Sequence, residues 1–501
     1  MKKRSILLAM AAMMLSATVY AQNDGEGKVI KTVEISRAEW LQKGVLKEKL
    51  GDDMYEIDSL VFVGGFFNYD SEGQSWAVLR DCIQHGRLRG IDFSGCSQNI
   101  LGQGLNFLVS DYAFTPAPQE TMPLRYVTLP EGTGVGKYAF TGTDLAHVNM
   151  ENVLSVGEGA FAGCNLKGEY DFSKIMRYGD YCFEGCSFSG TVEITEGVTE
   201  IGEGAFAWNT YVEKVVLPSS LEIIRDGAFD HCLKLNEVML PEGIKYLGNR
   251  AFNSCQIGNL MLPESIEYIG RDCFLGSVRN EKLTIPSMIM ELFPNEFFDS
   301  FNLQEIVWPE YLMKIGSGAF AYSRKIRSVV FPESLNSIDS LAFYSCGGLQ
   351  KVVLPEHLHH LGLGAFAECR SLQQVVMLNP TPPYTEIPRK LGEGSELYRQ
   401  VSPFNNIMED AVLYVPKGAK EAYEQAEYWR DFKTIIELEE GADLNDLPIK
   451  TGIEQTIADD SADAERQAMQ GIYTLHGVKV DGNYEALPRG MYIINGRKVV
   501  K

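Results

Sequence analysis

The chain has few of the residues that build metal sites and nucleic-acid sites. Only 7 of its 501 residues are histidine, and none of its 10 cysteines forms a Cys-x-x-Cys pair, so a structural zinc module has almost no candidate ligands. Lys and Arg number 45 against 67 Asp and Glu, for a net charge of −22. Such a surface lacks the positive charge that nucleic acids and anionic lipid head groups require. We therefore expect no nucleic-acid partner.

Long apolar runs are also scarce. After residue 21 no stretch reaches 18 apolar residues, so we expect no membrane-spanning segment. Residues 1–21 differ, because the basic residues Lys2, Lys3 and Arg4 precede the apolar run 6–15 and a small residue at Ala21. This order is typical of a signal peptide. It predicts cleavage after residue 21 and an exported protein that is secreted or held at the cell surface.

Phenylalanine recurs along the chain with a nearly constant period of 21 to 24 residues. The recurring residues are Phe140, Phe161, Phe183, Phe206, Phe229, Phe252, Phe274, Phe298, Phe320, Phe343 and Phe366. Proline keeps the same period, at Pro218, Pro241, Pro263, Pro286, Pro309, Pro332 and Pro355. Two independent markers with one period indicate a solenoid of stacked coils.

One coil of this solenoid extends from residue 235 to residue 255. It begins with alternating core residues typical of a strand, and Pro241 then ends the strand because proline cannot donate a hydrogen bond to the ladder. Ile244, Leu247 and Phe252 are expected to point back into the core. No coil could bury these residues alone, so stacking must do it. The predicted fold is α/β and β-rich, a curved solenoid of about 12 coils with a cap at each end.

The repeated pattern Leu-Pro-Glu-Gly…Ile-Gly-x-x-Ala-Phe-x-x-Cys resembles the BspA-like class of leucine-rich repeats, found in secreted and surface proteins of Bacteroides-type bacteria. We place these repeats at residues 91–378. The resemblance implies a leucine-rich-repeat solenoid at the cell surface. It also implies adhesion to host extracellular-matrix proteins or to other bacteria, and these partner classes rest on the family alone.

Six cysteines each follow a repeat phenylalanine by three residues, and so form one column of the solenoid. They are Cys164, Cys186, Cys232, Cys255, Cys346 and Cys369. In an exported protein, neighbouring coils could join such residues by disulfides. The alternative is a ladder of buried free thiols packed against the phenylalanines. Other coils have Ser323 or Asn209 in this column, so a cysteine in the neighbouring coil has no disulfide partner there. This favours the column of free thiols.

Other segments do not keep the period. We expect an N-terminal cap over 22–90, with helices near 40–50 and 75–83 and a strand at 57–63. Residues 379–437 resemble the terminal unit that closes BspA-like arrays. An acidic linker follows at 438–470. The last segment, 471–501, has alternating strands and resembles a short form of the C-terminal sorting tail of type IX secretion.

The candidate catalytic and metal-binding residues have positions that favour a structural role. Five glutamates follow the turn prolines, namely Glu242, Glu264, Glu310, Glu333 and Glu356. A glycosidase needs two carboxylates across one bond, but a residue repeated in most coils is expected to serve the turn itself. The one histidine cluster, His357, His359 and His360, aligns with exposed positions of other coils. We therefore predict that the protein is not an enzyme, has no catalytic residue, and binds no metal ion or cofactor.

One column does suggest binding. In each strand the position before the last core residue should face solvent on the concave side, and in eight strands only Thr284 is polar there. The predicted ligand-binding residues are Val216, Met239, Met261, Val307, Val330, Val353 and Val376. They would form an apolar stripe, flanked by Lys214, Glu237, Lys282, Glu305, Lys351 and Gln374. The alternative is that β-branched residues there only stabilise the sheet.

These observations predict a monomeric, non-enzymatic recognition protein. It would be a cell-surface adhesin that binds a host or microbial protein or glycan through the concave repeat face. The alternative is a structural or accessory component of a surface nutrient-capture or assembly complex. An enzyme would need a cleft in the irregular segment 379–412.

Overall fold

A computed structural model describes the chain at residues 20–23, 28–64, 74–96, 107–117, 120, 122–385, 402–439, 441–444, 447, 472–474, 479–480, 491–494 and 497–500. Residues 1–19 of the predicted signal peptide and most of the predicted linker lie outside these ranges. The chain divides into two compact units, Met1–Ala442 and Asp443–Lys501. Among the described residues, no helix has the length and apolar character needed to cross a bilayer.

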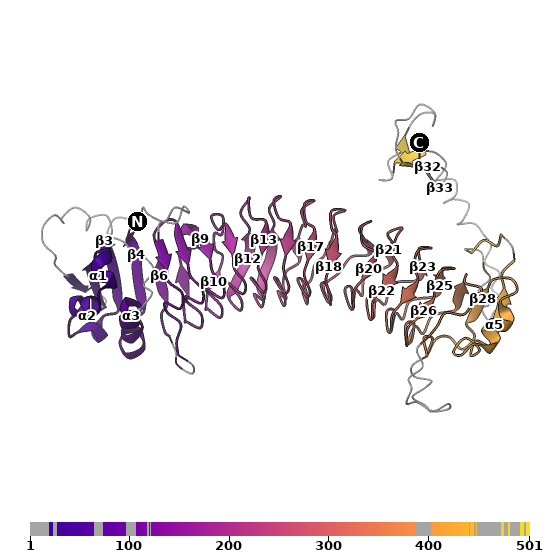
Figure 1. Ribbon diagram of the computed structural model, residues 1–501, viewed down its shortest axis with the longest axis horizontal. Coiled ribbons are helices and arrows are strands. Elements are labelled where there is room, and N and C mark those ends of the chain that lie inside the picture. The colour runs from indigo at the N-terminus through magenta and orange to yellow at the C-terminus, as the bar shows by residue number, and fades with distance from the viewer. Residues whose placement is uncertain are drawn as a thin grey trace. The chain divides into compact units, whose positions relative to one another are not determined.

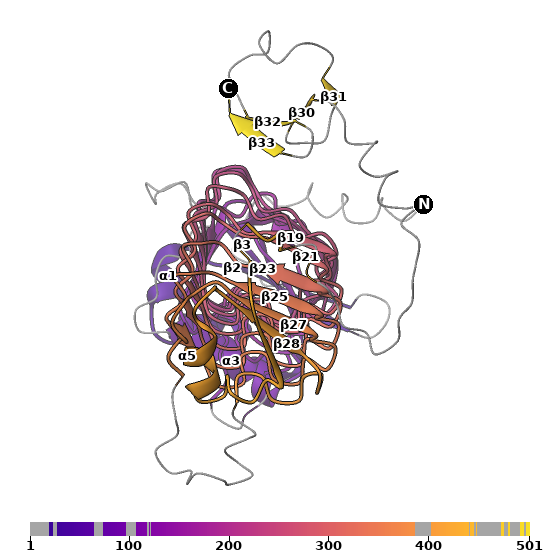
Figure 2. The same ribbon diagram turned by 90° about the vertical axis from the view of Figure 1, so that its right-hand side faces the viewer.

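The first unit is a parallel β-solenoid of about 14 turns, which confirms the predicted fold and extends the expected number of coils (Figure 1). Each regular coil contributes one short strand to a first sheet and one to a second sheet. The coils superimpose when the array is viewed along its length (Figure 2). Every strand pair in this unit is parallel except β1 with β2, so the chain always completes a full turn before it pairs again.

The first sheet is built from the strands that follow each repeat cysteine, and it is interrupted three times in the repeat region, so it has four parts. Its N-terminal part holds β1 (Tyr20–Asn23), β2 (Val29–Glu34), β3 (Ser59–Gly64), β4 (Gly90–Cys96), β6 (Tyr126–Thr128) and β8 (His147–Val148). The next part holds β10 (Lys167–Gly168), β12 (Ser187–Glu193), β14 (Tyr211–Val216) and β16 (Glu237–Val238). Then come β19 (Lys282–Thr284) and β21 (Glu305–Val307), and finally β23 (Ser328–Val330), β25 (Lys351–Leu354), β27 (Gln374–Met377), β28 (Val412–Val415) and β29 (Thr434–Glu437).

The second sheet is built from the strands that follow each turn proline, and it is interrupted once. Its longer part holds β5 (Phe107–Val109), β7 (Thr133–Val135), β9 (Val153–Val156), β11 (Arg177–Tyr178), β13 (Glu200–Ile201), β15 (Ile223–Ile224), β17 (Tyr246–Leu247) and β18 (Tyr268–Ile269). Its shorter part holds β20 (Glu291–Leu292), β22 (Lys314–Ile315), β24 (Ser337–Ile338) and β26 (His360–Leu361). The strands are short because turn residues leave little room in a coil of this length.

Main-chain hydrogen bonds join successive coils at fixed positions of the second sheet. The N–H groups of Lys245 and Tyr246 both donate to the carbonyl of Glu222, at 2.9 and 3.2 Å, and Gly248 donates to Ile224 at 2.8 Å. The same three bonds recur at each junction from β13 to β18 and from β20 to β26. They hold the coils at the strand spacing of about 4.8 Å, so every side chain meets its equivalent in the next coil.

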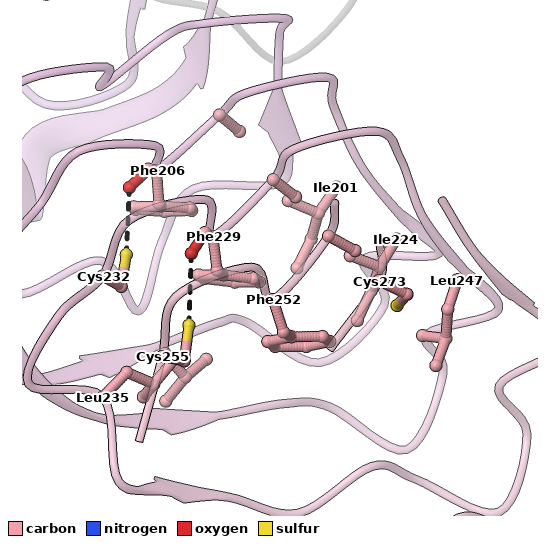
Figure 3. Packing of buried hydrophobic residues seen from close by; sticks show 14 of the residues in the cluster. Ile201, Phe206, Ile224, Phe229, Cys232, Leu235, Leu247, Phe252, Cys255 and Cys273 are labelled. Carbon is pink, nitrogen blue, oxygen red and sulfur yellow. Dashed lines mark hydrogen bonds between the residues drawn. The ribbon is translucent and has the colours of Figure 1, made fainter. Parts of the chain in front are cut away.

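Phenylalanine rings form the spine of the core. Phe206, Phe229 and Phe252 are fully buried, with centroids 5.5 and 5.4 Å apart and planes within 4° and 9° of parallel (Figure 3). Stacking at this distance is offset, because the coil spacing is shorter than the centroid separation. Ile224 and Leu247 fill the core beside the rings from the second sheet (Figure 3).

The sequence-based alignment was wrong at one coil. We expected Phe298 in the column, but Phe297 stacks between Phe274 and Phe320, at 5.8 and 5.4 Å, and is fully buried. Phe298 packs instead against Tyr322 outside the column. With Phe297 in place the spacing becomes 23 residues on both sides. The sequence alone does not distinguish the two adjacent phenylalanines, and only the geometry of the coil shows which one lies in the column.

The cysteine column holds free thiols. All ten cysteines of the chain are buried and unbonded to each other. Each column thiol points at the carbonyl of the phenylalanine one coil earlier, as Cys232 does to Phe206 at 3.3 Å and Cys255 to Phe229 at 3.4 Å (Figure 3). Asn209 fills the same position and donates to Phe183 at 2.8 Å. The column therefore supplies a donor to a buried carbonyl, which a disulfide would remove.

The segment predicted as an N-terminal cap has two short helices where one was expected at 40–50, and a helix and a strand near the other expected positions. Its helices are α1 (Arg37–Leu41), α2 (Val45–Leu50) and α3 (Gln74–His85), and a short 3-10 turn, η1, covers Met54–Glu56. A capping box between Ser36 and Glu39 starts α1. Trp40 and Trp76 meet edge to face at 5.0 Å, and Trp76 also contacts Phe114 of the array. The two indoles thus cover the end of the phenylalanine column.

The C-terminal end is closed by β28, β29 and the helix α5 (Lys420–Gln425). Phe404 continues the phenylalanine column at 5.8 Å from Phe366, and Trp429 packs edge-on against it at 5.2 Å. The Tyr423 hydroxyl donates to the carbonyl of Asn379 at 2.7 Å. Within the segment expected to form any enzymatic cleft, residues 386–401 lie outside the described ranges.

The described residues of the second unit include four antiparallel strands in the order β31-β30-β32-β33. They are β30 (Ile472–Thr474), β31 (Lys479–Val480), β32 (Met491–Ile494) and β33 (Arg497–Val500). β30 and β32 lie in the stretches 471–477 and 487–496, where alternating residues predict strands, and β31 and β33 lie outside these two stretches. Within the first unit, a further 3-10 turn, η2 (Met150–Asn152), lies between β8 and β9.

One buried carboxyl interrupts the apolar core. Glu296 takes the position that Ala251 and Ala319 hold in other coils and is fully buried. One of its oxygens accepts the N–H of Phe293 at 2.9 Å, and the other has no hydrogen-bond partner. Burial raises the pKa of this carboxyl well above its usual 4.5. The side chain is therefore held in its neutral form at a pH where a solvated glutamate is ionised.

The thiol column leads to a first prediction. Burial raises the pKa of Cys164 and of Cys232 to about 12, so the native thiols are neither exposed nor ionised. We expect maleimide to label no cysteine in the native protein and all ten after unfolding without reductant, as measured by intact mass. Fewer than ten labels after unfolding would show that disulfides form between coils and would contradict the free-thiol column.

Glu296 leads to a second prediction. Because its folded pKa is raised, the unfolded chain loses this proton first as pH rises above 4.5, and stability falls until the folded pKa is reached. The slope for one proton is at most about 1.4 kcal/mol per pH unit. We expect urea unfolding of the Glu296→Ala variant to lack this decline relative to wild type. Glu310→Ala, at an exposed turn, is the control, and parallel wild-type and Glu296→Ala curves would refute the assignment.

Candidate binding surfaces

The predicted stripe is exposed over its first part. Met239 is 77% exposed, Met261 69% and Val330 60%, while Val216 is 37% exposed and Val307 is half-buried. Val216, Val307 and Val330 lie in strands of the first sheet, where every second side chain faces outward. Met239 directly follows β16, and Met261 lies in the coil where this sheet is interrupted. Exposed methionines are flexible and polarizable, and they suit an adaptable apolar contact.

The last two residues of the predicted stripe are not available to a ligand. Val353 is 3% exposed and Val376 is fully buried, which contradicts the expectation that they face solvent. Residues of β27 and β28 are buried without alternation, so both faces of these strands are covered. A continuous apolar run such as Val-Leu-Tyr-Val in β28 is typical of a strand buried on both sides. The exposed stripe therefore ends at Val330.

Ion pairs run beside the stripe from one coil to the next. Lys214 pairs with Glu237, and Lys282 pairs with Glu305 at 2.7 Å. Both pairs are about half exposed, so each adds little to stability. These ion pairs place positive and negative side chains in equal number beside the apolar stripe. Of the predicted flanking residues, Gln374 is buried together with Val376.

At least one of the five turn glutamates forms a hydrogen bond that stabilises a turn. The carboxylate of Glu264 accepts the N–H of Ser287 in the next coil at 2.9 Å. Glu196, which also lies in a turn, accepts the N–H of Ser219 at the same distance. These contacts cap a turn donor that lies outside the ladder, which is the structural role expected for such residues.

The histidine cluster has a local structural arrangement. His360 Nδ1 lies 3.1 Å from the Ser337 hydroxyl and 3.8 Å from Asp339. His357 and His359 are exposed, and they line a shallow hollow with Glu333 and Asn336. Across the described ranges, no three His, Cys, Asp or Glu side chains are grouped so that they could hold a metal ion.

A groove that the sequence analysis missed lies on the second sheet, between β18 and β20. Its volume is about 470 Å³, and Tyr268, Phe293, Met288, Met290 and Met313 line it together with charged residues at its rim. The three methionines are 61%, 57% and 48% exposed. A signal was present in the sequence, because Met290 and Met313 replace the lysine or glutamate of neighbouring coils at a turn position.

An exposed aromatic pair marks a further hollow near the N-terminal end of the first sheet. Tyr126 is about half exposed and stacks on His147, with centroids 5.3 Å apart and planes within 6°. The hollow measures about 410 Å³, and Glu169 and Asp171 lie on its other side. The first sheet thus offers apolar side chains in its middle and aromatic and acidic groups nearer the N-terminal cap.

Comparison with known proteins agrees with this architecture. Residues 109–210, 199–297 and 291–390 match the BspA type leucine-rich-repeat region, in six copies. Comparison with curated proteins gives no match.

Several solved structures are similar. A leucine-rich repeat protein from Bacteroides ovatus is 19% identical over 73% of this chain and 94% of that chain, with a TM-score of 0.48. The pneumococcal vaccine antigen PcpA is 18% identical over 71% and 93%, with a TM-score of 0.39. A leucine rich cell surface protein from Faecalibacterium prausnitzii is 17% identical over 61% and 89%, with a TM-score of 0.37.

The family assignment depends on the repeat match and on the coil geometry. The matched segments extend from residue 109 to residue 390, which is more than half of the chain. Over this range the strands and buried phenylalanines repeat, and the turn prolines recur from Pro218 to Pro355. The chain belongs to the family of BspA-type leucine-rich-repeat proteins.

Proposed function

We propose that this chain is an exported, non-enzymatic recognition protein of the bacterial surface. It binds a protein or glycan partner through the outward face of the first sheet. The observation that carries this proposal is the exposure of Met239, Met261 and Val330 at equivalent positions of their coils, on the side of the first sheet. Exposed apolar side chains at the same position of several coils favour a binding surface over a surface selected only for solubility.

The nature of the partner follows from the shape and charge of this surface. An extended row of strand positions presents a long, shallow contact instead of a deep pocket, which suits another macromolecule. The stripe is apolar with paired charges beside it, so it does not select strongly for a charged ligand. The partner classes are host extracellular-matrix proteins, proteins of other bacteria and surface glycans, as the family resemblance suggests. Export agrees with the basic and apolar N-terminal segment at 1–21.

A third prediction tests this surface. The chain from residue 22 to residue 501 is offered to immobilised matrix proteins and glycans at physiological salt, and a saturable hit is measured by surface plasmon resonance. The triple variant Met239→Ser/Met261→Ser/Val330→Ser should weaken binding at least about tenfold, because the apolar contact area is lost. Stability should change little, since these side chains are already exposed.

The controls separate the stripe from general apolar exposure. Tyr311→Ser removes a side chain that is 62% exposed but lies in a turn, and it should leave binding unchanged. Val353→Ser is unsuitable as a binding test, because this buried residue contributes to packing. Undiminished binding of the triple variant contradicts recognition by the stripe. A well-folded chain that binds nothing in the screen would favour the accessory role in a surface complex.

A further inference from the structure

The groove on the second sheet is a break in the main-chain ladder. At every neighbouring junction three backbone bonds join the coils, as when Met313 and Lys314 donate to Met290 and Gly316 donates to Leu292, at 2.7, 3.3 and 2.8 Å. Within residues 122–385, all of which the structure describes, no such bond joins β18 to β20. Figure 1 places these two strands on either side of the junction. The coils remain joined on the phenylalanine side, where Asp272 donates to Pro294 at 3.0 Å.

The break has an identifiable cause in the sequence. Phe293 stands in the column that holds Gly248, Gly270 and Gly316, where the backbones approach so closely that a Cβ at Gly270 would lie 2.5 Å from the Asn249 nitrogen. A side chain alone does not open the junction. Arg225 and Asp339 occupy the same column and keep their ladder bonds.

The decisive difference is that another acceptor takes the N–H of Phe293. This N–H donates to the buried carboxyl of Glu296 at 2.9 Å, so it is turned away from the carbonyl of Ile269. The Phe293 ring lies against Tyr268, with centroids 5.3 Å apart, and occupies the space beside the strand. Two substitutions within one coil, of a glycine and of an alanine, therefore separate β18 from β20.

The separation leaves unused main-chain groups at the groove. By the pattern of the other coils, the carbonyls of Glu267 and Ile269 should accept bonds from the next coil, and the N–H groups of Met290 and Glu291 should donate. In the fully described stretch 122–385 these four groups form no backbone bond across the junction. A strand edge with free carbonyls and amides is a template for pairing with another extended chain.

The side chains around these groups define which peptide would fit. Met288, Met290 and Met313 offer a flexible apolar lining next to Tyr268. Lys314 is already paired with Glu291 at 3.0 Å and with Asp339 at 3.3 Å. Glu267 is exposed and makes no ion pair with any residue of the stretch 122–385. The groove therefore has surplus negative charge at the edge that carries the free carbonyls.

We infer that this groove is a peptide-binding site that works by strand addition. Its occupant is an extended segment of a partner protein with alternating apolar residues and a neighbouring lysine or arginine. The segment donates N–H groups to the carbonyls of Glu267 and Ile269, packs apolar side chains on the methionines, and places its cation near the Glu267 carboxylate. The site lies on the second sheet and does not depend on the stripe of the first sheet.

Hydrogen exchange tests whether the ladder is open. We expect the amides of Met290 and Glu291 to exchange at least about 100-fold faster than those of Met313 and Lys314, which occupy the same positions one coil later and are bonded. Equal protection of the two pairs would show a closed junction and would overturn the proposal.

A closing variant tests whether the open junction binds peptide. Phe293→Gly/Glu296→Ala restores the residues that other coils use, so it should re-form the three bonds and protect Met290 and Glu291 from exchange. Random linear heptapeptides displayed on phage are selected on the full mature chain. We expect enriched sequences with alternating apolar residues and a cation, and at least about tenfold weaker binding to the closing variant. A selection that yields no peptide sensitive to the closing variant would overturn the proposal.

Two further comparisons distinguish strand addition from simple apolar adhesion. An enriched peptide with methyl groups on alternate backbone nitrogens keeps its side chains but cannot donate, and it should lose at least about tenfold in affinity. Equal binding of the methylated peptide would overturn strand addition. The triple variant of the stripe, Met239→Ser/Met261→Ser/Val330→Ser, should bind the peptide normally. If it does not, the two surfaces are one site, and the groove proposal fails while the function proposed above can still stand.

Discussion

The main-chain ladder between coils is the constraint on which the rest of this structure depends. From β13 to β18 and from β20 to β26, three backbone bonds per junction hold each second-sheet strand to the next, and one of them joins Tyr246 to the carbonyl of Glu222. They set a spacing of about 4.8 Å, and at that spacing each side chain has its own equivalent as neighbour. A residue type can therefore recur at one position of every coil only if its side chain packs well against the same side chain of the next coil. Flat rings such as Phe229 do so by offset stacking.

The same constraint explains the cysteines. A buried carbonyl at each repeat phenylalanine has to be satisfied, and a small donor three residues further along the next coil reaches it. A thiol meets this requirement with little side-chain volume. Asn209 and Ser277 provide equivalent donors in other coils. Several residue types thus supply the donor at this position, although the Ser323 hydroxyl has no partner and Ser300 donates to Phe297 of its own coil.

Departures from the repeat are informative because the ladder makes them costly. Glu296 places a carboxyl in the core where alanine is usual, and one of its oxygens has no partner. Phe293 stands in a column that holds glycine in the two coils before it and in the coil after it, and its N–H bonds to Glu296 instead of to the ladder. Both occur in one coil, and together they open a junction instead of weakening the array generally. Next to that opening the exposed turn positions change from charged residues to methionines such as Met290 and Met313.

The sequence by itself determined the repeat length, the strand and turn positions, and the columns of phenylalanine, proline and cysteine. It could do so because each coil is a local unit, and its residues recur at a period that a single sequence displays. Only the tertiary structure decided that Phe297 and not Phe298 joins the column, and that Val353 and Val376 are buried while Met239 and Val330 are exposed. The groove between β18 and β20 also became visible only there. These features depend on which acceptor takes a given N–H and on what covers the outward face of a strand, and neither leaves a periodic trace in the sequence.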